Sequence, residues 1–148
     1  MKYVLMMMIV FGCSKDITTP EGLLSKFTKD ITTQKMSRDY YYEHTTGKMK
    51  EDIEALSDEE FEKYRDLSRV KGVKIDILKK NCSGATSCTL TYIIKYEFSK
   101  AEKETTNFKS EVKKVAKLVQ TEKEWKIEEV SNIKTYHESV EPINALEE

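Results

Sequence analysis

The sequence predicts an α+β domain in which helices come first and an antiparallel sheet follows. Apolar residues recur at helical spacing between residues 20 and 67, and from Val70 the period changes to two. Helices and strands in separate parts of a chain are typical of α+β architecture, with the helices on one face of the sheet. The chain has 148 residues, which suffices for one domain with a core but not for two.

The first helix is expected to begin at Thr19-Pro20-Glu21. These residues supply a capping hydroxyl, a proline at the first helical position and an acid in the first turn. Apolar residues then recur at the spacing of one buried helical face. They are Leu23, Leu24, Phe27 and Ile31.

Two further short helices are predicted before residue 68. One follows a break at Thr45-Thr46-Gly47, and its apolar residues are Met49, Ile53 and Leu56. The other begins with a capping box, Ser57 to Glu60, and its apolar residues are Phe61, Tyr64 and Leu67. The polar sides of these helices mix acids with bases, which favours packing on a core over lying on a membrane.

Four strands are predicted after residue 70, connected as an antiparallel meander. The first carries Val73, Ile75 and Ile77, and the second, with the strongest alternation, carries Leu90, Tyr92, Ile94, Tyr96 and Phe98. Residues 102–107 are polar and turn-like, and the third strand covers residues 108–120. A hairpin turn at residues 121–124 leads to the fourth, with Trp125, Ile127, Val130 and Ile133.

Cys82 and Cys88 flank five turn-forming residues between the first two strands. Opposed residues of an antiparallel pair lie ~4.5 to 5.5 Å apart, a separation that a disulfide can bridge. We therefore predict a structural disulfide. A metal half-site, a redox pair and two free thiols are the alternatives, although the sequence places neither His44 nor His137 near the cysteines.

The first twelve residues have the layout of a secretory signal. Lys2 precedes an uninterrupted apolar run, residues 3–11, which ends on a small residue before Cys13. Nine helical residues span roughly 14 Å, about half of a ~30 Å hydrocarbon core, so a stable transmembrane helix is excluded. The alternative is that residues 1–10 form a buried first strand of a cytosolic domain, with Cys13 in its core.

Val10-Phe11-Gly12-Cys13 resembles the lipobox of bacterial lipoproteins. The resemblance implies cleavage before Cys13, acylation of that cysteine and a location in the cell envelope. Ser14 resembles the residue that directs proteobacterial lipoproteins to the outer membrane, so that membrane is expected in a diderm host. The expected segments are a signal peptide (1–12), a lipidated cysteine with its tether (13–19), one domain (20–137) and an acidic tail (138–148).

Charge and motifs argue against several kinds of function. The chain has 25 basic and 26 acidic residues, and Lys79-Lys80 and the set Lys113, Lys114, Lys117 are interleaved with acids or apolar residues. This pattern indicates the solvated face of strands, and nucleic acid is not an expected partner. Because no catalytic, phosphate-binding or metal-binding motif occurs in the sequence, we expect no cofactor and no metal.

The stretch VAKLVQTEKEWKIEEVS, residues 115–131, predicts a strand, a tight turn and a second strand. With the helices before it, this pattern resembles small lipoproteins of the nuclear transport factor 2-like, or cystatin-like, superfamily. The resemblance implies a curved four-stranded sheet wrapped around the N-terminal helices. The resulting cone is a ligand pocket in some members and only a core in others.

Three functional hypotheses follow. An isomerase-like enzyme would use such a pocket with Asp39, residues 40–42 (three tyrosines) or His44 as base and proton donor; His137 is a weaker candidate. A binding module would line the pocket with Tyr92, Tyr96 and Trp125, although an aromatic stripe of period two is also typical of a core. A tethered accessory protein would contact membrane lipid through acyl chains and another envelope protein through its surface. Binding or accessory roles are favoured over catalysis.

Overall fold

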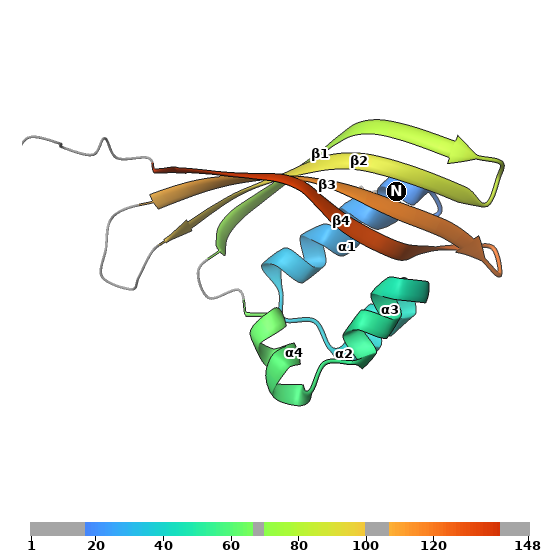
Figure 1. The fold of residues 1–148 in the computed structure, drawn as a ribbon, viewed down its shortest axis with the longest axis horizontal. Coiled ribbons are helices and arrows are strands. Elements are labelled where there is room, and N and C mark those ends of the chain that lie inside the picture. The colour runs from blue at the N-terminus through green and yellow to red at the C-terminus, as the bar shows by residue number, and fades with distance from the viewer. Residues whose placement is uncertain (1–16, 67–69, 100–106, 140–148) are drawn as a thin grey trace, which may run out of the picture.

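The computed structural model describes residues 17–66, 70–99 and 107–139. Four helices lie on one side of a four-stranded antiparallel sheet (Figure 1). The helices are α1 (Pro20–Thr33), α2 (Arg38–His44), α3 (Gly47–Glu54) and α4 (Asp58–Tyr64). The strands, which neighbour one another in chain order, are β1 (Val70–Ser83), β2 (Ser87–Ser99), β3 (Asn107–Thr121) and β4 (Glu124–Ser139). The α+β class and the antiparallel meander are confirmed.

The capping residues define the helix starts as the sequence predicts. The Thr19 hydroxyl accepts a hydrogen bond from the amide of Gly22 at 3.1 Å, and Pro20 lies in the first turn of α1. At α4 both halves of the capping box are present, because Ser57 and Glu60 each accept a hydrogen bond from the other's amide. These signals are local, so they can be recognised without tertiary information.

Helix α2 was not predicted. Its seven residues include three successive tyrosines, which are poor helix formers and show no helical periodicity over so short a segment. Packing stabilises it instead, since Tyr41 is buried and its ring meets Phe27 and Phe61 edge-on, with centroids 5.7 and 5.5 Å away.

The core lies between the helices and the inner face of the sheet. Leu24 and Phe27 from α1 and Ile53 from α3 pack there against the buried residues of the strands. Those strand residues are Leu90, Tyr92, Ile94, Ala116, Leu118 and Ile127. One end of the sheet, where β1 and β3 begin and β2 and β4 end, extends beyond the helices (Figure 1).

Both edge strands carry bulges that interrupt the alternation. The pairing passes over Leu78 in β1 and over Glu128 and Ile133 in β4. Leu78 is 50% exposed and Ile133 is 55% exposed. The sequence places Ile133 in the apolar stripe of its strand, but the bulge at Glu128 shifts the alternation, so that Val130 packs on the core and Ile133 faces outward. Bulges at sheet edges raise the local twist and hinder pairing with another chain.

The cysteine pair forms the predicted disulfide. Cys82 and Cys88 are opposed in the β1–β2 pairing, and their sulfur atoms lie 2.01 Å apart. The lipobox residues and Cys13 lie outside the described residues, as do residues 140–148 of the expected tail. Within the described segments, no helix combines the length and the apolar character that crossing a bilayer requires.

Candidate functional site

A groove runs along the inner face of the sheet, between the strands and helices α1 and α3. Its deeper part has a volume of about 380 Å³. Phe27 and Ile31 from α1 and Met49 from α3 form an apolar wall opposite Ile94 and Val130 of the sheet. A second hollow of about 440 Å³ continues toward the end of the sheet that extends beyond the helices. The two hollows share Thr32, Ile94, Lys114 and Asn132, so they form one groove, which we call the inner groove.

Lys114 lies where the two parts of the inner groove meet. It belongs to β3, and the pairing places it between Tyr92 of β2 and Asn132 of β4. Its side chain is half-buried, and burial lowers the pKa of its ammonium group. Among the described residues, none makes a hydrogen bond or an ion pair with this ammonium.

This placement corrects the expectation that Lys113, Lys114 and Lys117 all occupy a solvated face. Because adjacent strand residues point to opposite faces, Lys113 and Lys114 cannot both face solvent on the same side of the sheet. The outer face does carry cross-strand ion pairs, in which the Lys95 ammonium lies 3.5 Å from Asp76 and 3.8 Å from Glu111. Lys114 instead points toward the helices.

The carboxylates that line the inner groove do not compensate the charge of Lys114. Both oxygens of Asp52 accept hydrogen bonds from Lys48, at 3.1 and 3.0 Å, one helical turn away on α3. Glu129 also lines the groove and interacts electrostatically with Lys48, whereas burial is the cause that lowers the pKa of Lys114. Among the charged side chains that line the deeper part of the groove, Lys114 is therefore the one without a charged partner.

The three aromatic residues predicted to line a pocket lie in different places. Tyr92 is 2% exposed and lies in the floor of the inner groove, and burial raises the pKa of its hydroxyl. Tyr96 lines the outer part of the same groove. Trp125 is half-buried against the core near the β3–β4 hairpin, paired with Gln120, and lines neither hollow of the groove.

Of the residues considered for acid and base roles on α2, Tyr40, Tyr41 and His44 already have partners within the helical layer. The Tyr40 hydroxyl donates to Asp30 at 2.6 Å, and Tyr41 is buried in the core. The His44 ring packs on that of Tyr40, with centroids 4.3 Å apart, and its Nδ1 lies 2.8 Å from the Tyr40 carbonyl oxygen. Asp39 is exposed, and none of these side chains lines the inner groove.

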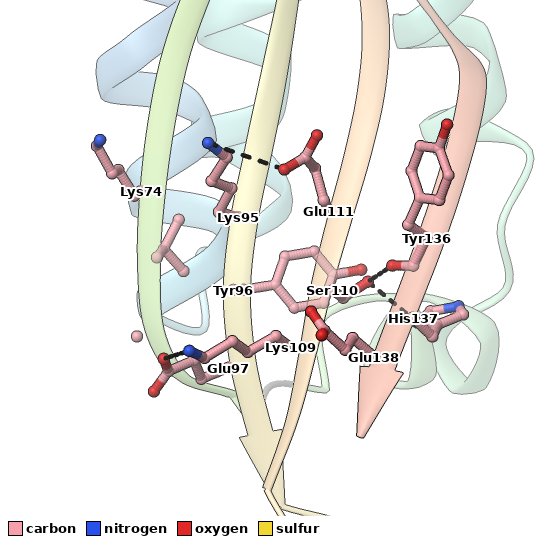
Figure 2. A pocket seen from close by; sticks show the side chains of 12 residues that line it. Lys74, Lys95, Tyr96, Glu97, Lys109, Ser110, Glu111, Tyr136, His137 and Glu138 are labelled. Atoms are coloured by element: carbon pink, nitrogen blue, oxygen red, sulfur yellow. Dashed lines mark hydrogen bonds and ion pairs between the residues drawn. The ribbon is translucent and has the colours of Figure 1, made fainter. Parts of the chain in front are cut away.

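Another hollow, of about 900 Å³, lies where the sheet extends beyond the helices (Figure 2). Here Nδ1 of His137 lies 3.1 Å from Oγ of Ser110, a pair formed by neighbouring strands. Figure 2 shows the Tyr96 ring extending from β2 toward β3, beside Ser110. Sequence reasoning missed the pair, because only the register of β3 and β4 brings the two residues together.

The Ser110–His137 pair does not have the arrangement of a nucleophile and its base. Ser110 is only 2% exposed, and its hydroxyl also lies 3.3 Å from the carbonyl oxygen of Tyr136. A nucleophilic oxygen must reach a substrate, and this one is enclosed by the strands. The contact therefore joins β3 to β4 as a structural hydrogen bond.

In the described part of the chain, no cluster of three or more His, Cys, Asp or Glu residues could hold a metal ion. No protein-family model matches the sequence, and no curated protein or solved structure is significantly similar to it.

Proposed function

We propose that this protein is a lipid-anchored lipoprotein of the cell envelope whose single domain acts by binding rather than by catalysis. The observation that carries the proposal is the Cys82–Cys88 disulfide. It accounts for two of the three cysteines and leaves Cys13, the last residue of the lipobox-like sequence, as the acylation site. Structural disulfides persist in oxidising compartments, which supports an extracytoplasmic domain.

The proposed anchor would hold the domain close to the membrane. A single acyl chain binds a bilayer only marginally, so Cys13 would carry two or three chains. The segment from Ser14 to Thr19 spans about 20 Å at full extension, at ~3.3 Å per residue. With Ser14 after the cysteine, we propose the outer membrane as the location in a diderm host. An envelope protein remains a candidate partner, and nucleic acid is not one.

The contrast between the inner groove and the candidate catalytic residues favours binding over catalysis. The inner groove combines an apolar wall with polar and charged side chains that can orient a ligand, a combination found in ligand sites. The buried Ser110 hydroxyl and the partnered residues of α2 do not converge on a shared space with a free acid and base. The inner groove is therefore the site that we assign to the binding role.

Mass spectrometry of the mature protein, produced in a diderm bacterium, tests the anchor. We expect a membrane-bound chain that begins at Cys13, carries acyl chains and is two hydrogens lighter than its reduced form because of the disulfide. A Cys13→Ser variant should lose acylation, whereas a Cys82→Ser/Cys88→Ser variant should keep it and lose only the mass change of oxidation. An unacylated wild-type chain, or Cys13→Ser protein that stays membrane-bound with no soluble mature form, contradicts the proposal.

A further inference from the structure

We propose that the inner groove binds a single-chain amphiphile with one carboxylate, a free fatty acid, and that the ammonium of Lys114 binds the carboxylate group. This inference rests on the binding role proposed above and names the class of ligand. It is argued from the position of Lys114, the charges around it and the shape of the groove.

The position of Lys114 is costly unless a ligand compensates it. Removing an ammonium from water without an anionic partner destabilises a protein, and the lowered pKa of Lys114 reflects this burial. Lysines on the same sheet are paired where carboxylates are near: Lys80 lies 2.7 Å from Glu21, and Lys117 lies 2.5 Å from Glu128. Lys114 departs from this pairing of lysines with carboxylates, and a residue that departs from such a local rule is a candidate for a functional role.

The charge in the groove specifies an anion with a single charge. Lys48 also lines the groove, but Asp52 already occupies its ammonium. The ring of His137 lines the outer part, where its Nδ1 contacts the Ser110 hydroxyl. A phosphate dianion would need further donors or cations beside Lys114, whereas one carboxylate matches one ammonium. Asn132, the neighbour of Lys114 across the β3–β4 pairing, also lines the groove and can donate a second hydrogen bond from its amide.

The shape of the groove specifies the rest of the ligand. Lys114 lies between the deep part, walled by Phe27, Ile31 and Met49, and the outer part that ends near Tyr96. An apolar chain fits against the deep wall while its charged end remains at the lysine. The deep part alone, about 380 Å³, lies at the lower end of the range for small-molecule sites, which favours a chain of medium length.

Calorimetric titration of the full chain carrying Cys13→Ser, oxidised and free of detergent, tests the proposal with three probes. These are decanoate, neutral 1-decanol and cationic decylammonium, each kept below its solubility limit and its micelle concentration. We expect the affinity for decanoate to exceed the affinity for either other probe by a factor of about ten or more, since one charge-assisted hydrogen bond contributes at least that factor. No binding of decanoate, or equal binding of decanoate and decanol, overturns the proposal.

Lys114→Met keeps the length of the side chain and removes its charge. We expect it to lower decanoate affinity about tenfold or more, to leave decanol affinity unchanged and to raise the denaturant concentration at the unfolding midpoint. Lys113→Met is the matched control, because this neighbour points to the outer face, and it should change neither affinity. A folded Lys114→Met protein that binds decanoate as wild type does refutes the role of this residue.

These measurements do not depend on acylation of Cys13. If decanoate does not bind, the proposal of a lipid anchor at Cys13 is unaffected. If the mature protein is not acylated, the proposal of a fatty-acid ligand in the groove is unaffected. The two proposals can therefore fail separately.

Discussion

The amide nitrogen of Thr46 lies 2.9 Å from the carbonyl oxygen of Ile127, and this hydrogen bond joins the α2–α3 loop to β4. The preceding residue, Thr45, is buried, pairs with Ile127 in a parallel bridge and donates its hydroxyl to the carbonyl of Tyr41 at 2.7 Å. The loop therefore lies directly against the sheet at the end of the inner groove where α3 begins.

Gly47 follows this contact, and we expect Gly47→Ala to destabilise the protein by about 1 to 3 kcal/mol. The φ angle of Gly47 is +49°, in the left-handed region, and an added Cβ would lie 2.9 Å from Cγ of Glu128. Chemical denaturation measures the change. Gly84→Ala is the matched control, because Gly84 also has a positive φ, +72°, but has open space around it. Equal losses for the two variants would show that the contact with Glu128 costs nothing.

Removal of the disulfide by Cys82→Ala/Cys88→Ala should lower the free energy of unfolding by about 2 kcal/mol. The bond closes a loop of about seven residues, and the chain-entropy argument assigns roughly this value to so short a loop. Urea unfolding of the double variant and of reduced wild-type protein should agree. A double variant as stable as the oxidised wild type contradicts the expectation.

Arg38 joins α2 to the end of α3, and Arg38→Lys should cost about 1 to 3 kcal/mol. Its guanidinium donates to the carbonyl oxygens of Ile53, Leu56 and Ser57 at 2.9, 2.7 and 2.9 Å. A lysine cannot reproduce this planar set of donors, so carbonyl groups lose their partners. The comparison is Lys63→Ala, which removes only an exposed ion pair on α4 and should change stability by less than about 0.5 kcal/mol. If both variants unfold at the same urea concentration, the guanidinium contributes no more than a surface charge.

Stability should fall as the pH rises above about 10, the ordinary pKa of tyrosine. Burial is the main cause that raises the pKa of Tyr40, Tyr41 and Tyr92, and Asp30 raises that of Tyr40 further. The folded state holds these protons more tightly than the unfolded state, so their stabilising contribution is complete below pH 10 and is lost at higher pH.

Urea unfolding between pH 8 and about 11.5 measures this dependence on pH. Lys114 acts with the opposite sign, because its lowered pKa relieves a destabilisation as the pH rises, so Lys114→Met is the appropriate background. In that background, Tyr92→Phe should flatten the fall in stability. If the slope of stability against pH is unchanged, Tyr92 has the same pKa in the folded and unfolded states.

The extent to which the site could be predicted differs from residue to residue. The alternation of β2 placed Tyr92 and Tyr96 on one inner face, and both line the inner groove. The pattern assigns Lys114 to the solvated face because its group of lysines is interleaved with acids or apolar residues, and the spacing of lysines does not reveal which one points inward. The contact between Ser110 and His137 depends on pairing across 27 residues, for which no local signal exists.

The sequence by itself determined the features that arise from neighbouring residues. Capping groups at Thr19 and Ser57, the period-two pattern after Val70 and the turn between Cys82 and Cys88 act within one helical turn or one hairpin, so they can be recognised along the chain. Only the tertiary structure decided the existence of α2, the bulges at Glu128 and Ile133, and the half-buried position of Lys114. The physical reason is that these depend on register and on packing between distant segments, where burial outweighs local preference.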